Sequence, residues 1–472
     1  MSKGIIISLI FLMVFNSCTK SVKEPVDYVN PFIDSHSSRW FYFASASRPF
    51  GTVSLSPDTS IKGSWNSGYL YDSLNVRCFS HIHDWQMAGI PVMPTTGKIR
   101  SHLGMEVTKS SFSHDTEVAK PGYHKVILDD YNITAELSST TRVGFHKYTF
   151  PKTDSAYINF HTGAHFAHGE VDSSFVKKVN KNEIEGFSLI GKTIRRPKST
   201  YVYFVAKIDH EIQEFGGWEN EKLLPASTEI NGKNNGAYLR FVSDGEPILM
   251  KVGISYTSIE NARKNMETEL SDWDFEKTVK ESKKEWNNVL SRIRVEGGSE
   301  KQKVKFYTDL WHALLGRKIV SDVDGKYCDM TGDHPVIKQV ELDNQGKPIF
   351  PHYNFDAWWG SHWTLNTLWS MAYPEIMDGF CSSMLNMYRD GGLIPRGPSG
   401  GNYTYVMIGD PAASFYACAY NKGIRHYDVD LAYEGLLKNA YSGGIRDRAG
   451  YEHQDNPTGG GMAYYQERGY VP

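Results

Sequence analysis

The hydrophobic period of the sequence changes once, near Ser258, and this change divides the chain into a β-rich part and a helical part. Before it, short apolar runs alternate with polar residues, and in residues 133–137 every second residue is apolar. A period of two is the pattern of a β-strand with one buried face. Turn residues separate further runs of this kind, at residues 143–150, 157–160, 201–208, 237–242 and 248–256. Many strands without helical periods between them predict a large antiparallel β-sandwich.

After the change, residues 259–293 carry apolar side chains at helical spacing among charged ones, which predicts a linker helix or a pair of helices. A brief strand is expected at residues 293–295. Beyond it we expect mainly helices. Pro374 suits the first turn of one helix and Gly391-Gly392 its end, and Asp428 is a plausible N-cap of another.

The predicted fold class is therefore a multidomain β + α chain. We expect a signal peptide at residues 1–17, a tether at 18–25, a β-sandwich domain at 26–257, a helical linker at 258–298 and a helical domain at 299–472.

The N-terminus is typical of a targeting segment. Lys3 precedes an apolar run at residues 5–15, which is too short to span a bilayer and suits the core of a signal peptide. Cys18 follows directly and resembles the lipidation site of a bacterial lipoprotein. We expect an exported protein that is lipid-anchored in the periplasm or at the outer-membrane surface, so that a membrane is a partner. The alternative is an ordinary secretory signal.

Composition excludes some other classes. The formal net charge of −3 and the lack of any basic run argue against a nucleic-acid partner. None of the five cysteines forms a CxxC pair, which argues against a structural zinc site. The four cysteines after Cys18 are expected to be buried thiols.

Residues 352–410 are the stretch most informative about function. Trp358, Trp359, Trp363 and Trp369 lie among carboxylates, histidines and an arginine. Flat aromatic faces beside hydrogen-bonding groups suit a sugar. For the apolar positions alone, a buried aromatic helix is the competing interpretation.

Several motifs, taken in order, resemble glycoside hydrolase family 92, the calcium-dependent exo-acting α-mannosidases of gut Bacteroidota. They are VNPFI (29–33), SRPFGTVSLSPDT (47–59), SGYLYD and FSHIHD (67–84), VMPTTG (92–97), FYTDLWHALL (306–315), SDVDGKY (321–327), GGLIPR (391–396) and VMIGDP (406–411). The resemblance implies an N-terminal β-sandwich, a helical linker and an (α/α)6 toroid, with the active site between sandwich and toroid. It also implies inverting hydrolysis of an α-mannoside or related glycan, in N-glycan or mannan degradation, with calcium distorting the sugar.

The chain departs from the family pattern at three places. Family members run on for several hundred residues beyond the position of Pro472, so we expect an N-terminal portion with an incomplete toroid. Its catalytic carboxylates and most calcium ligands would lie beyond Pro472. The family's Trp-Asp pair and following arginine are matched by Trp359-Gly360 and Trp363. DWQMAGIP replaces a glycine-rich loop after FSH. A glycan-binding surface lipoprotein without catalysis and a nonfunctional fragment are therefore the alternatives.

We expect no catalytic residue in the chain and can name no metal ligand, although His81 and His83 alternate as on one face of a strand. Asp356 and Asp410 would touch substrate or act as helix N-caps, and Arg396 would hold hydroxyls or fasten a loop. The aromatic and histidine candidates would contact sugar or pack in the core. The full set of expected substrate-binding residues is Trp40, His83, Asp84, Trp85, Asp356, Trp358, Trp359, His362, Arg396 and Asp410.

Overall fold

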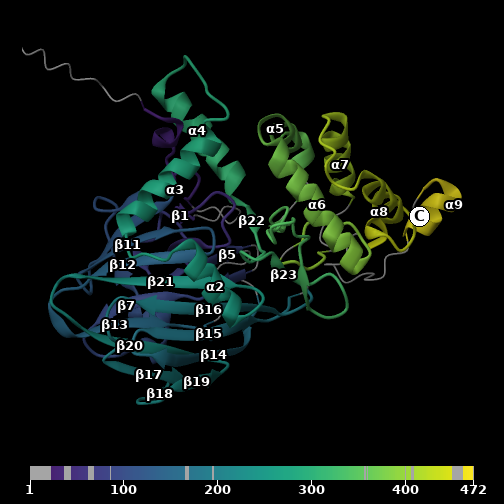
Figure 1. Cartoon of the computed structure of the whole chain (residues 1–472). Coiled ribbons are helices and arrows are strands. Elements are labelled where there is room, and N and C mark those ends of the chain that lie inside the picture. Colours follow the sequence, from purple (N-terminus) through teal and green to yellow (C-terminus); the bar gives the residue numbers. More distant parts are fainter. Residues whose placement is uncertain are drawn as a thin grey trace, which may run out of the picture.

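The computed structural model describes residues 23–36, 44–61, 68–84, 87–164, 169–193, 196–355, 358, 360–398, 400–404, 409–448 and 461–470. A β-sandwich and a lobe of helices lie side by side, and the helices α3 and α4 sit above the sandwich (Figure 1). Among the described residues, no helix has the length and apolar character needed to cross a bilayer.

Two large antiparallel sheets form the sandwich. The first has eight strands, in the order β1 (Ala46–Ser47), β2 (Ser54–Asp58), β4 (Cys78–Ser80), β7 (Val92–Thr96), β13 (Thr153–Phe160), β20 (Asn235–Ser243), β17 (Glu214–Glu219) and β18 (Lys222–Leu224). The second has nine, in the order β19 (Glu229–Gly232), β14 (Val171–Asn180), β15 (Glu183–Ile190), β16 (Thr200–Ile208), β21 (Pro247–Ser255), β12 (Val143–Thr149), β11 (Ile133–Ser139), β10 (Tyr123–Leu128) and β9 (Val118–Lys120).

The alternation in the sequence explains these strands. In β11, Ile133, Ala135 and Leu137 are fully buried, whereas Thr134 and Glu136 are only partly so. The buried faces of both sheets meet in one apolar core. The predicted antiparallel sandwich is confirmed. Short elements decorate it, namely η1 (Pro25–Tyr28), η2 (Ser101–Leu103), α1 (Met105–Thr108) and the strand pairs β3 (Asn75–Val76) with β8 (Ser110–Ser111) and β5 (Ile82–Asp84) with β6 (Met87–Gly89).

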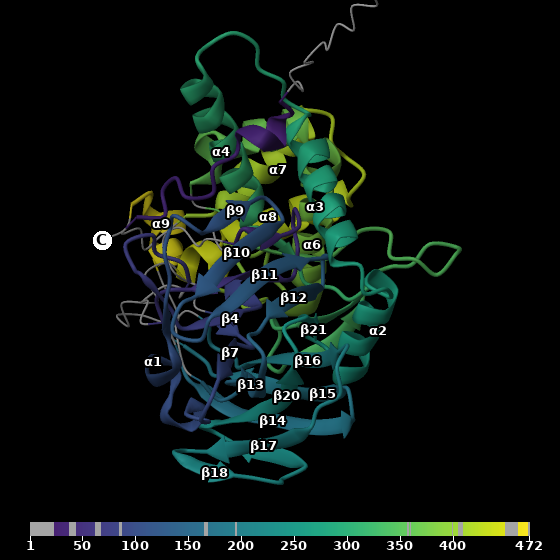
Figure 2. The same ribbon diagram turned by 90° about the vertical axis from the view of Figure 1, so that its left-hand side faces the viewer.

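Two helices form the linker, as one of the two expected arrangements has it. They are α2 (Ile259–Glu269), capped by Ser258, and α3 (Phe275–Leu290), capped by Asp274. Figure 2 shows α2 beside β16 and β21, two inner strands of the second sheet, on which it packs. The strand expected at residues 293–295 is wrong. The Tyr307 hydroxyl takes the backbone partners there, since it accepts from Val295 N at 3.2 Å and donates to Ile293 O at 3.3 Å.

The helical lobe follows α4 (Glu300–Leu315). It consists of η3 (Ser361–Trp363), α5 (Leu365–Ala372), α6 (Pro374–Gly391), α7 (Pro411–Asn421), α8 (Val429–Ala440), η4 (Ile445–Arg448) and α9 (Gly461–Arg468). The expected signals are confirmed: Pro374 begins α6, Gly392 ends it in the left-handed conformation with φ of 80°, and the Asp428 side chain caps α8. A complete or incomplete (α/α)6 toroid stays a prediction, as do the domain boundaries. The four cysteines after Cys18 are free, and Cys78 and Cys381 are buried.

Buried polar contacts join the lobe to the sandwich. The connecting segment carries the strand pairs β22 (Arg317–Ile319) with β25 (Tyr353–Phe355) and β23 (Lys326–Asp329) with β24 (Val336–Gln339). On β22, Lys318 Nζ lies 2.7 Å from Asp84 Oδ1 and donates to Ser54 Oγ at 2.7 Å. Farther along, Asp322 accepts hydrogen bonds from four side chains, Ser255, Thr257, Asn261 and Asn265.

Candidate functional site

Three separate segments of the lobe meet where α6 ends, α7 begins and α8 ends. Hydrogen bonds to backbone groups hold the segment after α6. Asn439, in the last turn of α8, accepts from Ile394 N at 3.3 Å and donates to Ile394 O at 2.9 Å. The Tyr403 hydroxyl accepts from Leu393 N at 2.9 Å. These bonds fix the path of the chain as it reaches Arg396.

Arg396 is buried and joins the three segments by hydrogen bonds. Its Nε donates to Gly409 O at 2.9 Å, and its Nη2 donates to Ile445 O at 2.6 Å. The side chain is 1% exposed. A planar guanidinium can donate in several directions at once. Arg396 thus holds the residues just before Asp410 and Arg446 close to each other.

Asp410 is the unusual group at this junction. Its side chain is fully buried, and neither carboxylate oxygen has a hydrogen-bond partner among the described residues. Arg446 Nε lies 3.8 Å from Oδ2. Asp410 stands at the N-cap position of α7, but its side chain caps no backbone amide. Buried polar groups nearly always have partners, so a carboxylate without one points to a ligand.

The electrostatics follow from burial. Burial raises the pKa of the Asp410 carboxyl above its usual value, and this is partly offset by the charge of Arg446, the nearby Asn439 amide, the charge of Arg396 and the Ala413 backbone N–H. Neither amide meets the geometry of a hydrogen bond to Asp410. Ser361 Oγ, at the start of η3, which packs on α7, is a second buried polar atom without a hydrogen-bond partner among the described residues. The arrangement can accept hydrogen bonds from hydroxyl groups through Asp410 while two guanidinium groups balance its charge.

The aromatic candidates differ sharply in environment. Trp358 is buried and packs edge-on against Phe415 of α7, with ring centroids 4.3 Å apart. Trp363 is 78% exposed, and His362 beside it is also exposed. A Cβ atom added to Gly360 would meet nothing within 4 Å. The two positions that depart from the family pattern, Gly360 and Trp363, therefore border open space.

In the sandwich, His83 and Asp84 are both buried and have partners within the protein. His83 Nδ1 donates to Ser54 O at 2.6 Å, and its Nε2 lies 2.8 Å from Asp58 Oδ1. Asp84 pairs with Lys318. Their contact with substrate stays a prediction. His81 does not share a ligand with His83, because its Nε2 lies 2.8 Å from His146 Nε2.

Five expected functional residues lie outside the described residues, namely Cys18, Trp40, Trp85, Asp356 and Trp359. Sequence reasoning also missed residues that shape the junction around Asp410. Asn439 and Ser361 belong to ordinary helical segments and gave no signal. Arg446 lies two residues after the glycine pair 443–444, and a basic residue in a glycine-rich loop is the sequence signal that could have identified it.

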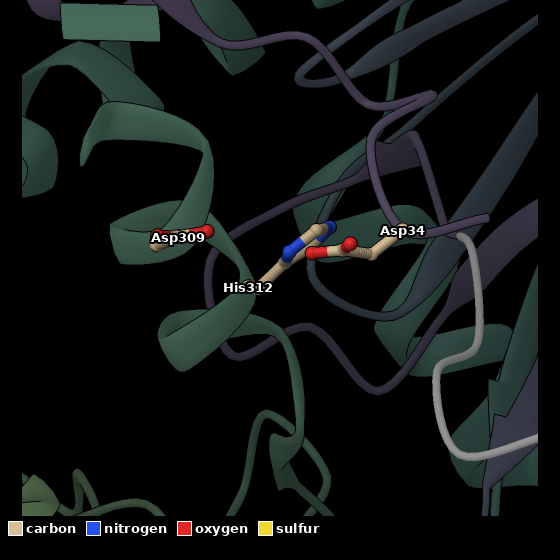
Figure 3. A group of neighbouring side chains, drawn as sticks. All are labelled: Asp34, Asp309 and His312. Carbon is tan, nitrogen blue, oxygen red and sulfur yellow. The ribbon is translucent and has the colours of Figure 1, made fainter. Parts of the chain in front are cut away.

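Calcium can be tested against one group of side chains. Asp34, Asp309 and His312 offer ligand atoms within 4.8 Å of one another, the only described trio of this kind. Figure 3 shows the His312 ring pointing toward Asp34, with Asp309 also on α4. Calcium takes about six to eight oxygen ligands. Here one donor is nitrogen, and Asp309 already pairs with Lys305 Nζ at 2.5 Å. These residues therefore do not fit calcium.

Comparison with known proteins places both parts of the chain. Residues 28–255 match the glycosyl hydrolase family 92 N-terminal domain, and residues 261–472 match the family 92 catalytic domain. A curated relative from Arthroderma benhamiae, named "Uncharacterized secreted glycosidase", is 25% identical over 438 residues, which are 84% of this chain and 50% of the relative.

Solved structures agree with the fold. A family GH92 alpha-mannosidase from Bacteroides thetaiotaomicron is 27% identical with a TM-score of 0.83, over 96% of this chain and 60% of that chain. A family GH92 inverting mannosidase from the same organism shares the fold, with a TM-score of 0.80 at 24% identity over 95% of this chain and 59% of that chain.

The sandwich, the helical lobe and these matches define a glycosidase architecture. The chain belongs to glycosyl hydrolase family 92. It spans about half the length of the curated relative and 60% of the length of the first solved structure. The expectation of an N-terminal portion with part of a toroid is corrected to a chain that matches both family domains, because the catalytic-domain model matches residues 261–472.

Proposed function

We propose that the chain serves an exo-acting, inverting glycosidase of α-mannosidase type, and that the junction around Asp410 holds the sugar. Family membership supports the reaction class, and the relative from Bacteroides thetaiotaomicron is an alpha-mannosidase by its description. That protein was also solved in complex with mannoimidazole. The observation that carries the proposal is the buried Asp410 carboxylate with no hydrogen-bond partner among the described residues.

Asp410 orients the sugar in this proposal and does not transfer a proton. Inversion needs an acid and a base roughly 6.5–9.5 Å apart, with a water molecule between them. Asp447, the carboxylate in the same short segment as Arg446, already accepts from Gly443 N at 2.9 Å and Met462 N at 3.0 Å. We therefore assign the acid, the base and the calcium ligands to no described residue. Arg396 positions the backbone on both sides of the sugar.

Export is part of the same proposal. The Arthroderma benhamiae relative is described as secreted, and the signal-like segment ending at Cys18 supports export with a lipid anchor. Cys18→Ser should move the protein from the membrane fraction to the soluble exported fraction. Unchanged membrane association would contradict the anchor.

A second function is favoured by the exposed Trp363. An indole that is 78% exposed at the position of the family's arginine can stack on a sugar face without taking part in hydrolysis. A surface protein that binds glycan without turnover is therefore the alternative. Hydrolysis by the protein would exclude it.

The test compares Arg396→Lys with Arg389→Lys, an arginine that is about half exposed on α6. Lysine cannot donate to the Gly409 and Ile445 carbonyls together, so affinity for methyl α-mannoside should fall about tenfold. The Arg389 variant should bind as the unmodified chain does. Equal binding by both variants would remove Arg396 from the site. Hydrolysis of α-1,2-mannobiose by the chain alone would overturn our proposal that no described residue is the acid or the base.

A further inference from the structure

The sandwich contains a cleft of about 610 Å³ that is separate from the residues around Asp410. It lies where β13, β17 and β20 meet η2, which packs on the latter two strands. Ligand pockets usually measure roughly 300–1,000 Å³, so the cleft has room for a small ligand. Its described lining comes from the sandwich alone and includes Ser101, His102, Gly104, His161, Trp218 and Asn234.

Three buried polar atoms of the lining have no hydrogen-bond partner among the described residues. They are Ser101 Oγ, His102 Nδ1 and His161 Nε2. The Ser101 and His161 side chains are almost wholly buried, at 1% and 3% exposure. Native proteins leave few such atoms unpaired, and three in one cleft indicate that a bound molecule supplies the partners.

The aromatic wall of the cleft is fixed in place. Trp218 is buried and meets the His161 ring edge-on, with ring centroids 5.2 Å apart. A Cβ atom at Gly236 would lie 2.2 Å from Trp218 Cζ2, so only glycine lets the indole sit there. The wall is therefore preformed, which lowers the entropy cost of binding.

The charges of the cleft select its ligand. Glu221 is the only charged residue among the described lining residues, and Asn220 and Asn234 supply amide groups. The Asn235 amide is already used, since it donates to Ser174 O and accepts from Thr162 Oγ1. Burial lowers the pKa of His161 to about 4, so its imidazole is neutral at pH 7. No described lysine or arginine lines the cleft, so it offers no cation to an anionic ligand. Hydroxyl groups both donate and accept, and so match a serine, the neutral imidazole of His161 and amides.

We propose that this cleft is a second sugar-binding site, which takes an uncharged sugar residue beside Trp218 and hydrogen-bonds it through Ser101, His102 and His161. The site would hold glycan on the sandwich whether or not the helical lobe binds or hydrolyses sugar.

Equilibrium dialysis of the full chain tests this with methyl α-mannoside, N-acetylglucosamine and galactose separately, and with glucuronate as an anion. At least one neutral sugar should bind at the cleft with a Kd of about 1 mM, typical of weak recognition. His161→Phe should weaken that binding at least about tenfold, and Ser101→Ala should weaken it severalfold. Asp410→Asn should leave it unchanged and affect only binding at the lobe.

Stability separates a binding role from a packing role. Phenylalanine fills the place of His161 without a polar atom, so His161→Phe should unfold at the same or a higher denaturant concentration. His352→Phe is the matched control, because His352 is equally buried with an unpartnered Nδ1 but does not line the cleft. It should leave sugar binding unchanged. The proposal is overturned if no neutral sugar binds at about 20 mM, if the folded His161 and Ser101 variants bind like the unmodified chain, or if glucuronate binds more tightly than every neutral sugar.

Discussion

Two buried aspartates differ in their hydrogen bonding. Asp322 lies where the connecting segment meets the sandwich, and Asp410 lies at the end of the helical lobe. Asp322 accepts hydrogen bonds from four side chains, including Asn261 at 2.8 Å and Asn265 at 2.7 Å. Asp410 accepts none from the described residues. Burial raises the pKa of both carboxyls above the usual value. Both aspartate side chains are therefore buried, but Asp322 is fully hydrogen-bonded and Asp410 has no hydrogen bond from the described residues.

This difference separates structure from function. A buried carboxylate without donors destabilises the folded chain, whereas a fully paired one fastens it. Asp322 connects β21, α2 and the segment that leads to the lobe. At the end of the lobe, the sugar of the proposed function would supply the donors that Asp410 lacks among the described residues. Asp322 should therefore control stability, and Asp410 should control binding.

Acid should produce the largest effect, and should act on the sandwich and on the connecting segment around His352 before α6 and α7. Burial lowers the pKa of His81 and His161 to about 4, and that of His146 well below its usual value. Unfolded histidine titrates near ~6.5. Stability is therefore complete above that pH and is lost as pH falls from ~6.5 to 4, because only the unfolded chain takes up the protons. The loss should be about 3 kcal/mol for each of His81 and His161.

Hydrogen exchange at pH 7.5 and 4.5 tests the order of unfolding. His362 and His426 are exposed, whereas burial lowers the pKa of His352, in the connecting segment, to about 3, so peptides from β13, β7 and the segment around His352 should lose protection before peptides from α6 and α7. Earlier loss of protection in α6 would break the contrast between the two regions.

Asp322→Ala should be the most destabilising of the single substitutions considered. It leaves Ser255, Thr257, Asn261 and Asn265 without their shared acceptor in a buried place. We expect the free energy of unfolding to fall by about 4 kcal/mol, as measured by urea denaturation. Asp324→Ala, at a more exposed neighbouring carboxylate, serves as the control and should cost less than about 1 kcal/mol.

Lys318→Met should cost about 3 kcal/mol, since it leaves the charge of Asp84 buried and unpaired. The double variant Lys318→Met/Asp84→Asn removes both charges and should recover part of that loss. A double variant no more stable than the single one would show that packing, and not the ion pair, holds β22 to β5.

Most of the difference between Asp322 and Asp410 could not be predicted from the sequence, because it depends on contacts between residues far apart along the chain. Pro374, Gly392 and Asp428 act within one helical turn, and their roles were predicted. Asp84 and Lys318 lie far apart in the sequence and meet only in the folded chain, so the motif around Asp84 suggested a substrate contact, whereas its observed partner is a lysine. Asp410 was identified as a candidate from its motif, but its lack of donors depends on Arg396, Asn439 and η4, which only the fold brings together.

Asp410→Asn should reverse the pattern seen at Asp322. The carboxylate has no hydrogen bond to lose, so the free energy of unfolding should change by less than about 1 kcal/mol. Affinity for methyl α-mannoside should nevertheless fall about tenfold or more, since an amide accepts fewer hydrogen bonds from hydroxyls. Asp430→Asn, on the first turn of α8, is the control and should change neither quantity. A large loss of stability in the Asp410 variant would assign this residue a structural role like that of Asp322.

Gly360→Asp with Trp363→Arg should give the smallest effect on stability. It tests whether added polar groups at the end of the lobe increase sugar binding there. It supplies the two groups that the family pattern has at this end of the lobe. Gly360 has ordinary dihedral angles with φ of −101°, an added Cβ meets nothing, and Trp363 is exposed, so stability should change by less than about 0.5 kcal/mol. Calorimetry should show tighter binding of methyl α-mannoside, by about tenfold. Met371→Arg, another exposed position on α5, controls for added surface charge. If the double variant binds no better than this control, Trp363 itself serves the ligand, and the sugar held beside Asp410 is not the one that the family pattern implies.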